Sequence, residues 1–277
     1  MGRNLPAMTD ERDFDRDVAV EATGAGRYRA EMVPHWWVVA GPNGGIVAAV
    51  LANAMTTELA DPNRQLRTIT VHYPSPAAAG AVYVDVTVER MGRSVATLSA
   101  RMTQGDRMIA LATAAFSPPW TSPIAFSDHM PPDVPTPSSL ADRRGEAGAL
   151  LPPVATNWDT RWTEPGALFA GGDEAVLRAW IRTDRPRPID PLALTAICDA
   201  LPPAVFVRSK APIAAPTVEL TVHVRAQLPH PGLEPDHHVL AECSTATVAD
   251  GFLDEDVKVW AADGTLLAHS RQLALAR

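Results

Sequence analysis

One acidic residue interrupts an apolar stretch in the second part of the chain. Asp199 lies in the segment LTAICDAL, between Cys198 and Ala200. A carboxylate is costly to bury unless it is paired or takes part in chemistry. Because a buried carboxylate can orient a water molecule or take a proton from it, Asp199 is a candidate functional residue. The alternative is that Asp199 lies on the one exposed face of its helix.

A pair of glycines opens an earlier apolar stretch. Gly44 and Gly45 follow Asn43 and precede the run IVAAVLANAM. Glycine lets other groups approach the backbone closely, and free N–H groups at a helix start favour a developing negative charge. We therefore expect these three residues to face a substrate, unless the glycines serve only to fit the turn and pack the helix. Trp37, just before them, is a candidate for a tunnel wall or for the core.

Other catalytic motifs are missing from the sequence. There is no GxSxG elbow and no phosphate-binding P-loop. His237 and His238 lie beside Asp236 but lack a third ligand at a recognised spacing, so we expect no metal site.

Gly44 and Gly45 lie at the start of a predicted helix that is followed by predicted strands. Residues 41–59 predict a helix that is apolar on all sides, and such a helix must be buried. Strands are then predicted from alternating apolar residues and turn signals over 67–76, 81–92, 94–106 and 107–116.

The same order of elements returns in the second part. Residues 174–185 predict a strand, and Asp190 followed by Pro191 is a strong helix-start signal. This second helix carries Asp199, and we expect Pro202 and Pro203 to end it. Strands are predicted after it over 216–229, 237–251, 252–264 and 265–277.

The two parts also share letters. Thr70-Val71-His72 recurs as Thr221-Val222-His223, and the terminal hairpins align Ile109 with Leu267. A short match inside the same order of elements indicates an internal duplication.

Proline marks the boundary between the two parts. The chain has 26 prolines, and nine of them fall between residues 118 and 153, where no regular pattern is found. Proline removes backbone donors and blocks helices and central strands. The sequence therefore predicts a first half over 1–117, a proline-rich linker over 118–153 and a second half over 154–277. The alternative is a long surface loop within one domain.

Composition excludes several classes of protein. The 277 residues are 46% hydrophobic with a net charge of −8, which is typical of a folded protein and argues against nucleic-acid binding. The longest apolar run, about Ile46–Met55, is too short to span a membrane. Two cysteines make no disulfide framework, and no secretory signal is visible, so we expect a cytoplasmic protein. The acidic run 9–17 is interpreted as a solvated surface.

A buried helix followed by four strands, repeated once, resembles the double hotdog fold. The chain is identified as resembling the type II acyl-CoA thioesterases of the thioesterase-like superfamily, over residues 20–117 and 155–277. The resemblance implies an α+β architecture in which each long central helix is wrapped by a curved antiparallel sheet.

The resemblance also implies a catalytic trio that holds one water molecule. Its Asp falls on Asp199, its Ser or Thr on Thr217 at the start of the following strand, and its Gln on Gln272 in the last strand. Such a site needs neither a metal, a cofactor nor a covalent nucleophile. The repeat offsets give Ala48, Leu66 and Ala114 as counterparts in the first half, so the polar site belongs mainly to the second half.

The function implied is hydrolysis of a fatty acyl-CoA to free fatty acid and CoA, in lipid metabolism. Gly44, Gly45, Asn43 and Trp37 are expected to bind the substrate, and Arg64, Arg67 and Arg208 are candidates for its phosphates. A non-catalytic acyl-CoA or acyl-thioester binding protein of the same fold is the alternative. A third possibility is an assembly partner, since hotdog sheets pair along their edges; we expect a homo-oligomer.

Overall fold

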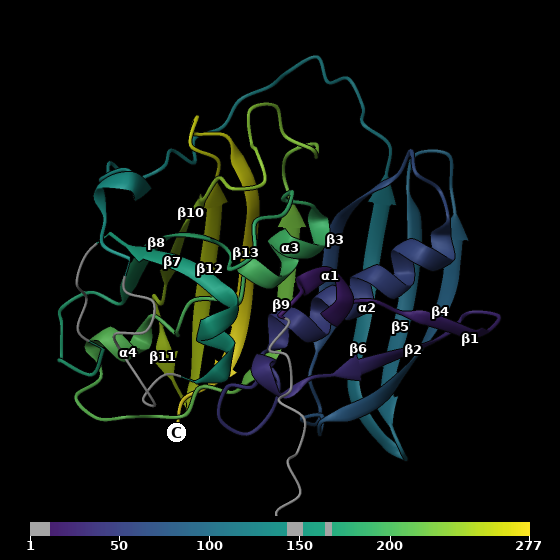
Figure 1. Ribbon diagram of the computed structural model, residues 1–277, viewed down its shortest axis with the longest axis horizontal. Coiled ribbons are helices and arrows are strands. Elements are labelled where there is room, and N and C mark those ends of the chain that lie inside the picture. Colours follow the sequence, from purple (N-terminus) through teal and green to yellow (C-terminus); the bar gives the residue numbers. More distant parts are fainter. Residues whose placement is uncertain (1–11, 143–151, 164–167) are drawn as a thin grey trace, which may run out of the picture.

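The computed structural model describes residues 12–142, 152–163 and 168–277. Their strands form a single antiparallel sheet in the order β1-β2-β4-β5-β6-β3-β9-β13-β12-β10-β8-β7, with β11 added beside β12. Helices α2 and α3 lie on the same side of this sheet and pack against each other (Figure 1). The fold class is therefore a large antiparallel sheet with few helices.

The strands of the first part of the chain form one half of the sheet. They are β1 (Glu21–Gly24), β2 (Arg27–Met32), β3 (Gln65–His72), β4 (Gly80–Met91), β5 (Ala96–Gln104) and β6 (Arg107–Ser117). The strands of the second part form the other half. They are β7 (Trp158–Trp162), β8 (Val176–Thr183), β9 (Thr217–Val224), β10 (Val239–Ser244), β11 (Val248–Ala249), β12 (Phe252–Trp260) and β13 (Leu266–Leu275).

The two halves meet where β3 pairs with β9. Thr70 is the partner of Thr221 in this antiparallel register, and their side-chain oxygens are 2.9 Å apart. The strand order on either side is mirrored, because the partner of β3 is β6 and the partner of β9 is β13. The tripeptide repeat found in the sequence therefore lies at the centre of the sheet, where the first residue of one copy pairs with the first residue of the other.

Helix α2 (Gly44–Leu59) is the buried helix expected from the sequence. Asn43 caps it, because its side-chain oxygen accepts the N–H of Ile46 at 3.3 Å. Eleven of its 16 residues are buried, as an all-apolar helix requires. It ends at Ala60, which adopts a left-handed conformation with φ of 50°.

The second helix is shorter than the sequence predicts. Helix α3 (Pro191–Ile197) begins as expected, with Asp190 accepting the N–H of Ala193 at 2.8 Å. Beyond Ile197 the backbone makes tighter bonds, from Asp199 N–H to Ala196 O and from Ala200 N–H to Ile197 O. Pro202 cannot donate to a helical carbonyl, so the chain leaves the helix and resumes only in the short α4 (Val205–Arg208). Asp199 thus lies just after the helix and not within it.

Short elements precede the repeats and were not expected. Helix α1 (Phe14–Asp17) and the 3-10 turn η1 (Pro34–Trp36) are joined by Asp17, which accepts bonds from His35 at 2.5 Å and from the Trp36 indole at 3.0 Å. The expectation that residues 9–17 form a solvated surface is therefore wrong for Asp17, which is only 5% exposed. Residues 1–11 are outside the described ranges.

The described part of the proline-rich segment lies against the second half of the sheet. It contains the 3-10 turn η2 (Pro137–Ser139), and η4 (Pro153–Asn157) follows it; residues 143–151 are outside the described ranges. The indole of Trp180 donates to Pro135 O and that of Trp260 to His129 O, each at 2.9 Å. This segment is thus fastened across β8 and β12 on the side of the sheet away from α3.

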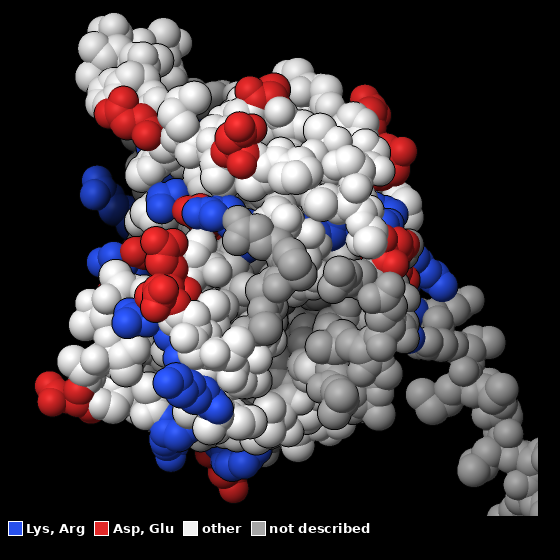
Figure 2. Space-filling view, turned by 90° about the vertical axis from the view of Figure 1, so that its left-hand side faces the viewer, with Lys and Arg blue, Asp and Glu red and all other residues white. Residues whose placement is uncertain are grey.

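Charged side chains of both signs lie on the surface of the molecule (Figure 2). Figure 2 shows Lys and Arg beside Asp and Glu over much of the described part of one face. Among the described residues, no helix is long and apolar enough to cross a bilayer.

Candidate active site

Asp199 reaches from the second half of the chain to the start of α2 in the first half. Its Oδ2 accepts a bond from the Asn43 side-chain amide at 2.9 Å and from the Gly45 N–H at 2.8 Å. Asn43 Nδ2 also donates to the Asp199 backbone carbonyl at 2.7 Å. The positive end of a helix dipole favours such a carboxylate. The structure therefore brings together Asp199, Asn43 and Gly45, which the sequence proposed separately.

The glycine pair allows this approach. A β-carbon on Gly45 would lie 2.7 Å from the carbonyl oxygen of Ala196, at the end of α3. A β-carbon on Gly44 would lie 3.0 Å from Asp199 Oδ2. The expectation that the glycine amides face a substrate differs from the structure at Gly45, because its N–H is used by Asp199.

Burial raises the pKa of Asp199 to about 6, while the bonds from Gly45, Asn43 and Gly44 partly oppose this shift. A carboxyl group with this pKa is mostly ionised at neutral pH and can still accept a proton during a reaction.

Tyr73 completes the surroundings of Asp199 and was missed from the sequence. Its hydroxyl donates to Gly44 O at 2.9 Å. Burial, followed by the charges of Asp199 and Glu219, raises its pKa well above the ordinary value, so the phenol stays protonated. Its signal in the sequence was only its position, directly after β3.

Gln272 is buried in the sheet beneath this region. It is 4% exposed on β13, and its register partners are Leu220 on β9 and Glu255 on β12. Its Nε2 lies 3.4 Å from Glu255 Oε1, and its Oε1 is buried without a hydrogen-bond partner among the described residues. Two residues along β13, Ser270 donates to Cys198 O at 3.4 Å, so this face of the strand meets the end of α3.

Glu255 is a second buried carboxyl group that the sequence analysis did not single out. It is 3% exposed, and its Oε2 accepts the Ala204 N–H at 3.2 Å. Burial and then the charge of Asp199 raise its pKa to about 8, against the hydrogen bonds from Ala204 and Cys243. The alternation along β12, which places Leu253 and Val257 in the core, could have identified it.

The three residues of the expected trio are not directly bonded to one another. Thr217 begins β9 and is the register partner of Ala274, which follows Gln272 by two residues on the same face of β13. Within the described ranges, no hydrogen bond joins Asp199, Thr217 and Gln272 to one another. Glu255 interacts with two of them. Burial and then the charge of Asp199 raise the pKa of Glu255, and Glu255 Oε1 accepts a bond from Gln272 Nε2 at 3.4 Å.

The remaining substrate candidates take different places. Trp37 is half-buried in the loop before α2, and its backbone carbonyl accepts the Val154 N–H at 3.0 Å. Arg64 pairs with Asp61 at 2.9 Å and holds the Gly92 carbonyl at 2.8 Å, so it fastens its own loop.

The other two arginine candidates for the phosphates are Arg67 and Arg208. Burial and the nearby charge of Arg225 lower the pKa of Arg67, and Arg208 is exposed at the end of α4.

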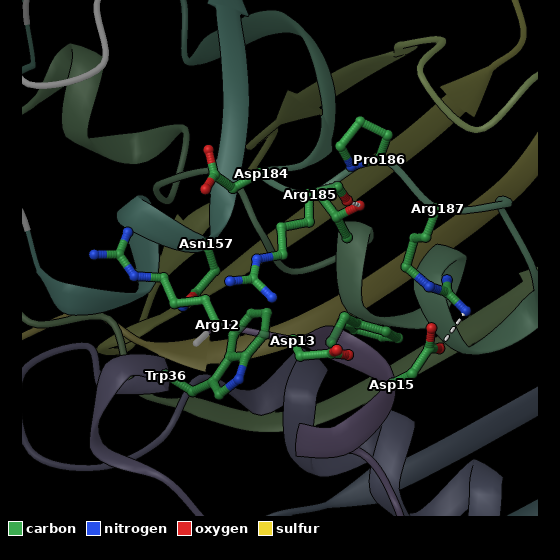
Figure 3. Close-up of a pocket in the computed structure, with 11 residues that line it drawn as sticks. Arg12, Asp13, Asp15, Trp36, Asn157, Asp184, Arg185, Pro186 and Arg187 are labelled. Carbon is green, nitrogen blue, oxygen red and sulfur yellow. Dashed lines mark hydrogen bonds and ion pairs between the residues drawn. The ribbon is translucent and has the colours of Figure 1, made fainter. Parts of the chain in front are cut away.

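A cavity of about 180 Å³ lies at the opposite end of α3. Figure 3 shows Arg187 and Asp15 joined on one side of it, with Arg12 and Trp36 on the other. Arg187 bonds both Asp15 and Asp190, each at 2.7 Å. Because Asp190 is the cap of α3, this cluster fastens α1 to the start of that helix. Among the described residues, no group of three or more His, Cys, Asp or Glu is arranged to hold a metal ion.

Comparison with known families agrees with this architecture. Residues 33–117 match the model of the acyl-CoA thioesterase N-terminal domain, and residues 127–276 match that of the acyl-CoA thioesterase C-terminal domain. The chain therefore belongs to the acyl-CoA thioesterase family.

Similar proteins support the same assignment. A hot dog fold protein of unknown function from Alicyclobacillus acidocaldarius is 28% identical with a TM-score of 0.83, over 95% of this chain and 97% of that one. A putative thioesterase II from Thermobifida fusca is also 28% identical, with a TM-score of 0.80 and the same coverage. An uncharacterized protein of Mycobacterium bovis is 23% identical over 90% of each chain. The fold is thus that of hotdog thioesterases.

Proposed function

We propose that the protein hydrolyses acyl-CoA thioesters to a free fatty acid and CoA. Its architecture is a double hotdog, with one repeat in residues 1–117, a linker over 118–153 and a second repeat in 154–277. Family membership and the mirrored strand order support this arrangement.

The observation that carries the proposal is the placement of Asp199. Its carboxylate is held by Asn43 and Gly45, so it is fixed in orientation at a junction between two helices. Both of these bonds go to Oδ2. A fixed carboxylate with a pKa of about 6 has the properties of a general base near neutral pH.

In the proposed reaction, water is held by Asp199, Thr217 and Gln272. The water oxygen attacks the thioester carbonyl carbon while Asp199 takes one proton from the water. The carbon–sulfur bond then breaks, and Asp199 returns the proton to the sulfur of CoA. The products are the carboxylic acid and the free thiol, so no metal, cofactor or covalent intermediate enters the reaction.

The test is thiol release from acyl-CoAs of several chain lengths. Asp199→Asn keeps an oxygen that can accept the Gly45 N–H, so the fold is retained while the base is lost. We expect a decrease in kcat of about 10²- to 10⁴-fold. The wild-type rate should rise with pH through a midpoint near 6, as Asp199 loses its proton. Equal rates in the two proteins would overturn the assignment of Asp199.

One observation favours the alternative of a non-catalytic acyl-thioester binding protein. The Gly45 N–H, a natural donor to a developing oxyanion, is occupied by a carboxylate. Tight binding of acyl-CoA without thiol release by the wild type would establish this alternative.

The wider setting follows from the same proposal. An acyl-CoA substrate places the protein in lipid metabolism in the cytoplasm. In the described part of the sheet, β1 and β7 are the outermost strands, and such edges favour assembly into a homo-oligomer.

A further inference from the structure

Glu255 and Gln272 form a buried pair across neighbouring strands. They are register partners on β12 and β13, and each is less than 5% exposed. Glu255 is also tied to the loop after α3, because its Oε2 accepts the Ala204 N–H at 3.2 Å. The reaction proposed above uses Gln272 but assigns nothing to Glu255. A buried carboxyl group is costly to retain, so its role needs a physical account.

The bonding of the pair determines how the Gln272 amide is turned. With Nε2 toward Glu255 Oε1, the Gln272 oxygen is buried and has no partner among the described residues. A buried amide oxygen without a partner costs free energy unless a ligand or water donates to it. In this orientation Gln272 offers an acceptor, which can orient the second hydrogen of a water molecule whose first hydrogen is held by Asp199.

We propose that Glu255 is a positioning residue for Gln272, and that its ionised carboxylate holds the amide with Oε1 presented to the reacting water. This inference rests on the proposed hydrolysis for its effect on rate, and on the geometry of the pair for its effect on the amide.

Protonation of Glu255 reverses the orientation. Since Oε2 accepts the Ala204 N–H, the proton resides on Oε1, which faces Gln272. An O–H group at this position needs an acceptor, and the amide must turn to offer its oxygen. The Nε2 group then replaces Oε1 at the water, so a donor stands where an acceptor is needed.

The groups around Glu255 determine the pH at which its carboxylate becomes protonated. Asp199 faces it from the end of α3 and raises its pKa, whereas the hydrogen bond with Cys243 of β10 lowers it. Burial raises the pKa of the Cys243 thiol well above its usual value and that of the Cys198 thiol to about 12, so both thiols stay neutral. Glu255 therefore changes charge near pH 8 while its cysteine neighbours do not.

Glutamine at position 255 reproduces the protonated state. The Ala204 N–H selects the carbonyl oxygen of the new amide, which turns its NH₂ group toward Gln272. Glu255→Gln should therefore fix Gln272 in the reversed orientation at every pH.

The kinetic experiment measures kcat and KM for acyl-CoA between pH 6.5 and 9. Above the rise near pH 6 assigned to Asp199, the wild-type kcat should rise a second time with a midpoint near 8. Glu255→Gln should lack this second rise and stay about 10-fold or more below the wild-type value at pH 9, with an unchanged KM. Cys243→Ala removes a bond that lowers the Glu255 pKa and should move the midpoint to higher pH. Glu242→Gln, the same change at a side chain of β10 that pairs with Arg178, is the control and should retain the wild-type profile. A wild-type profile in Glu255→Gln would overturn the proposal.

A second readout is independent of hydrolysis. The chain contains four glutamines, so ¹⁵N labelling of their side chains gives four amide signals, and Gln272→Met identifies that of Gln272. This signal should titrate near pH 8 in the wild type and not in Glu255→Gln. A titrating signal without thiol release would reject the proposed function and retain the positioning role. A signal that does not titrate would overturn the positioning role even in an active enzyme.

Discussion

Two rows of three residues cross the buried face of the sheet at equivalent places in the two halves. In the first half the row is Leu98, Ala114 and Ile69, on β5, β6 and β3. In the second half it is Glu255, Gln272 and Leu220, on β12, β13 and β9. The register of the backbone is the same, and all six side chains are buried. The two rows therefore differ only in their side chains. The first row is entirely apolar, whereas the second contains the polar groups of Glu255 and Gln272.

The helices that pack over the two halves of the sheet differ in length. Helix α2 runs for 16 residues, while α3 ends after seven. The early end of α3 lets the chain turn so that the Asp199 carboxylate meets the start of α2. The start of the long helix α2 thus supplies the donors, and the chain just after the short helix α3 supplies the acceptor.

The largest effect is expected from giving the first row the acid of the second. Leu98→Glu places a carboxylate at a position with 0% exposure. We expect a loss of about 4 kcal/mol or more in the free energy of unfolding, measured by denaturant titration. The reverse change, Glu255→Leu, should be tolerated or stabilising above pH 8. Equal stability of Leu98→Glu and wild type would show that the rows do not differ in kind.

Making the second row resemble the first should remove activity and spare the fold. Gln272→Ala reproduces the Ala114 of the first row and deletes a group proposed to hold water. We expect kcat to fall about 100-fold, measured by thiol release. Ala114→Ser, which adds a hydroxyl to the first row, should leave kcat unchanged; a comparable loss there would place part of the chemistry in the first half.

The contact between the two helices can be tested at Gly45. A β-carbon there would lie 2.7 Å from a backbone oxygen, which forces α2 and α3 apart. Gly45→Ala should lower the free energy of unfolding by about 2 kcal/mol and also weaken the hold on Asp199. Gly24→Ala is the control, because its β-carbon meets another atom only at 4.0 Å. Equal melting temperatures for the two variants would argue against the close approach.

The smallest effect is a dependence of stability on pH that belongs to the second row. The pKa of Glu255 is raised from 4.5 to about 8, so between these values the folded protein keeps a proton that the unfolded chain loses. The free energy of unfolding should therefore fall as pH rises, with a contribution of up to ~1.4 kcal/mol per pH unit. Denaturant titrations of wild type and Glu255→Gln between pH 6.5 and 8 measure it as their difference. A constant difference would contradict the raised pKa.

The sequence predicts the parts of this comparison that depend on local pattern. The apolar run after Asn43 predicts α2 to within three residues, and alternation predicts the strands from β3 to β6. The end of α3 was placed too late because a proline blocks a helix some residues before its own position, through the donors it lacks.

Long-range proximity could not be obtained in this way. Asp199 and Gly45 are 154 positions apart, and only the pairing of β3 with β9 brings their helices together. Glu255 lies in the acidic run DED, where charge suggests a surface although alternation places the middle residue inside. Edge elements such as β1 and β7 are short and gave no periodic signal.

The contact between Thr70 and Thr221 has a consequence for how such a chain can change. In a two-fold dimer of identical subunits, a residue on the axis meets its own copy, as Thr70 meets Thr221 here, and every other contact occurs twice. In such a dimer every substitution is present in both subunits, so a buried acid introduced in one subunit also destabilises the other. In a single polypeptide the two sides of the seam are separate sequence positions, so each side can change alone.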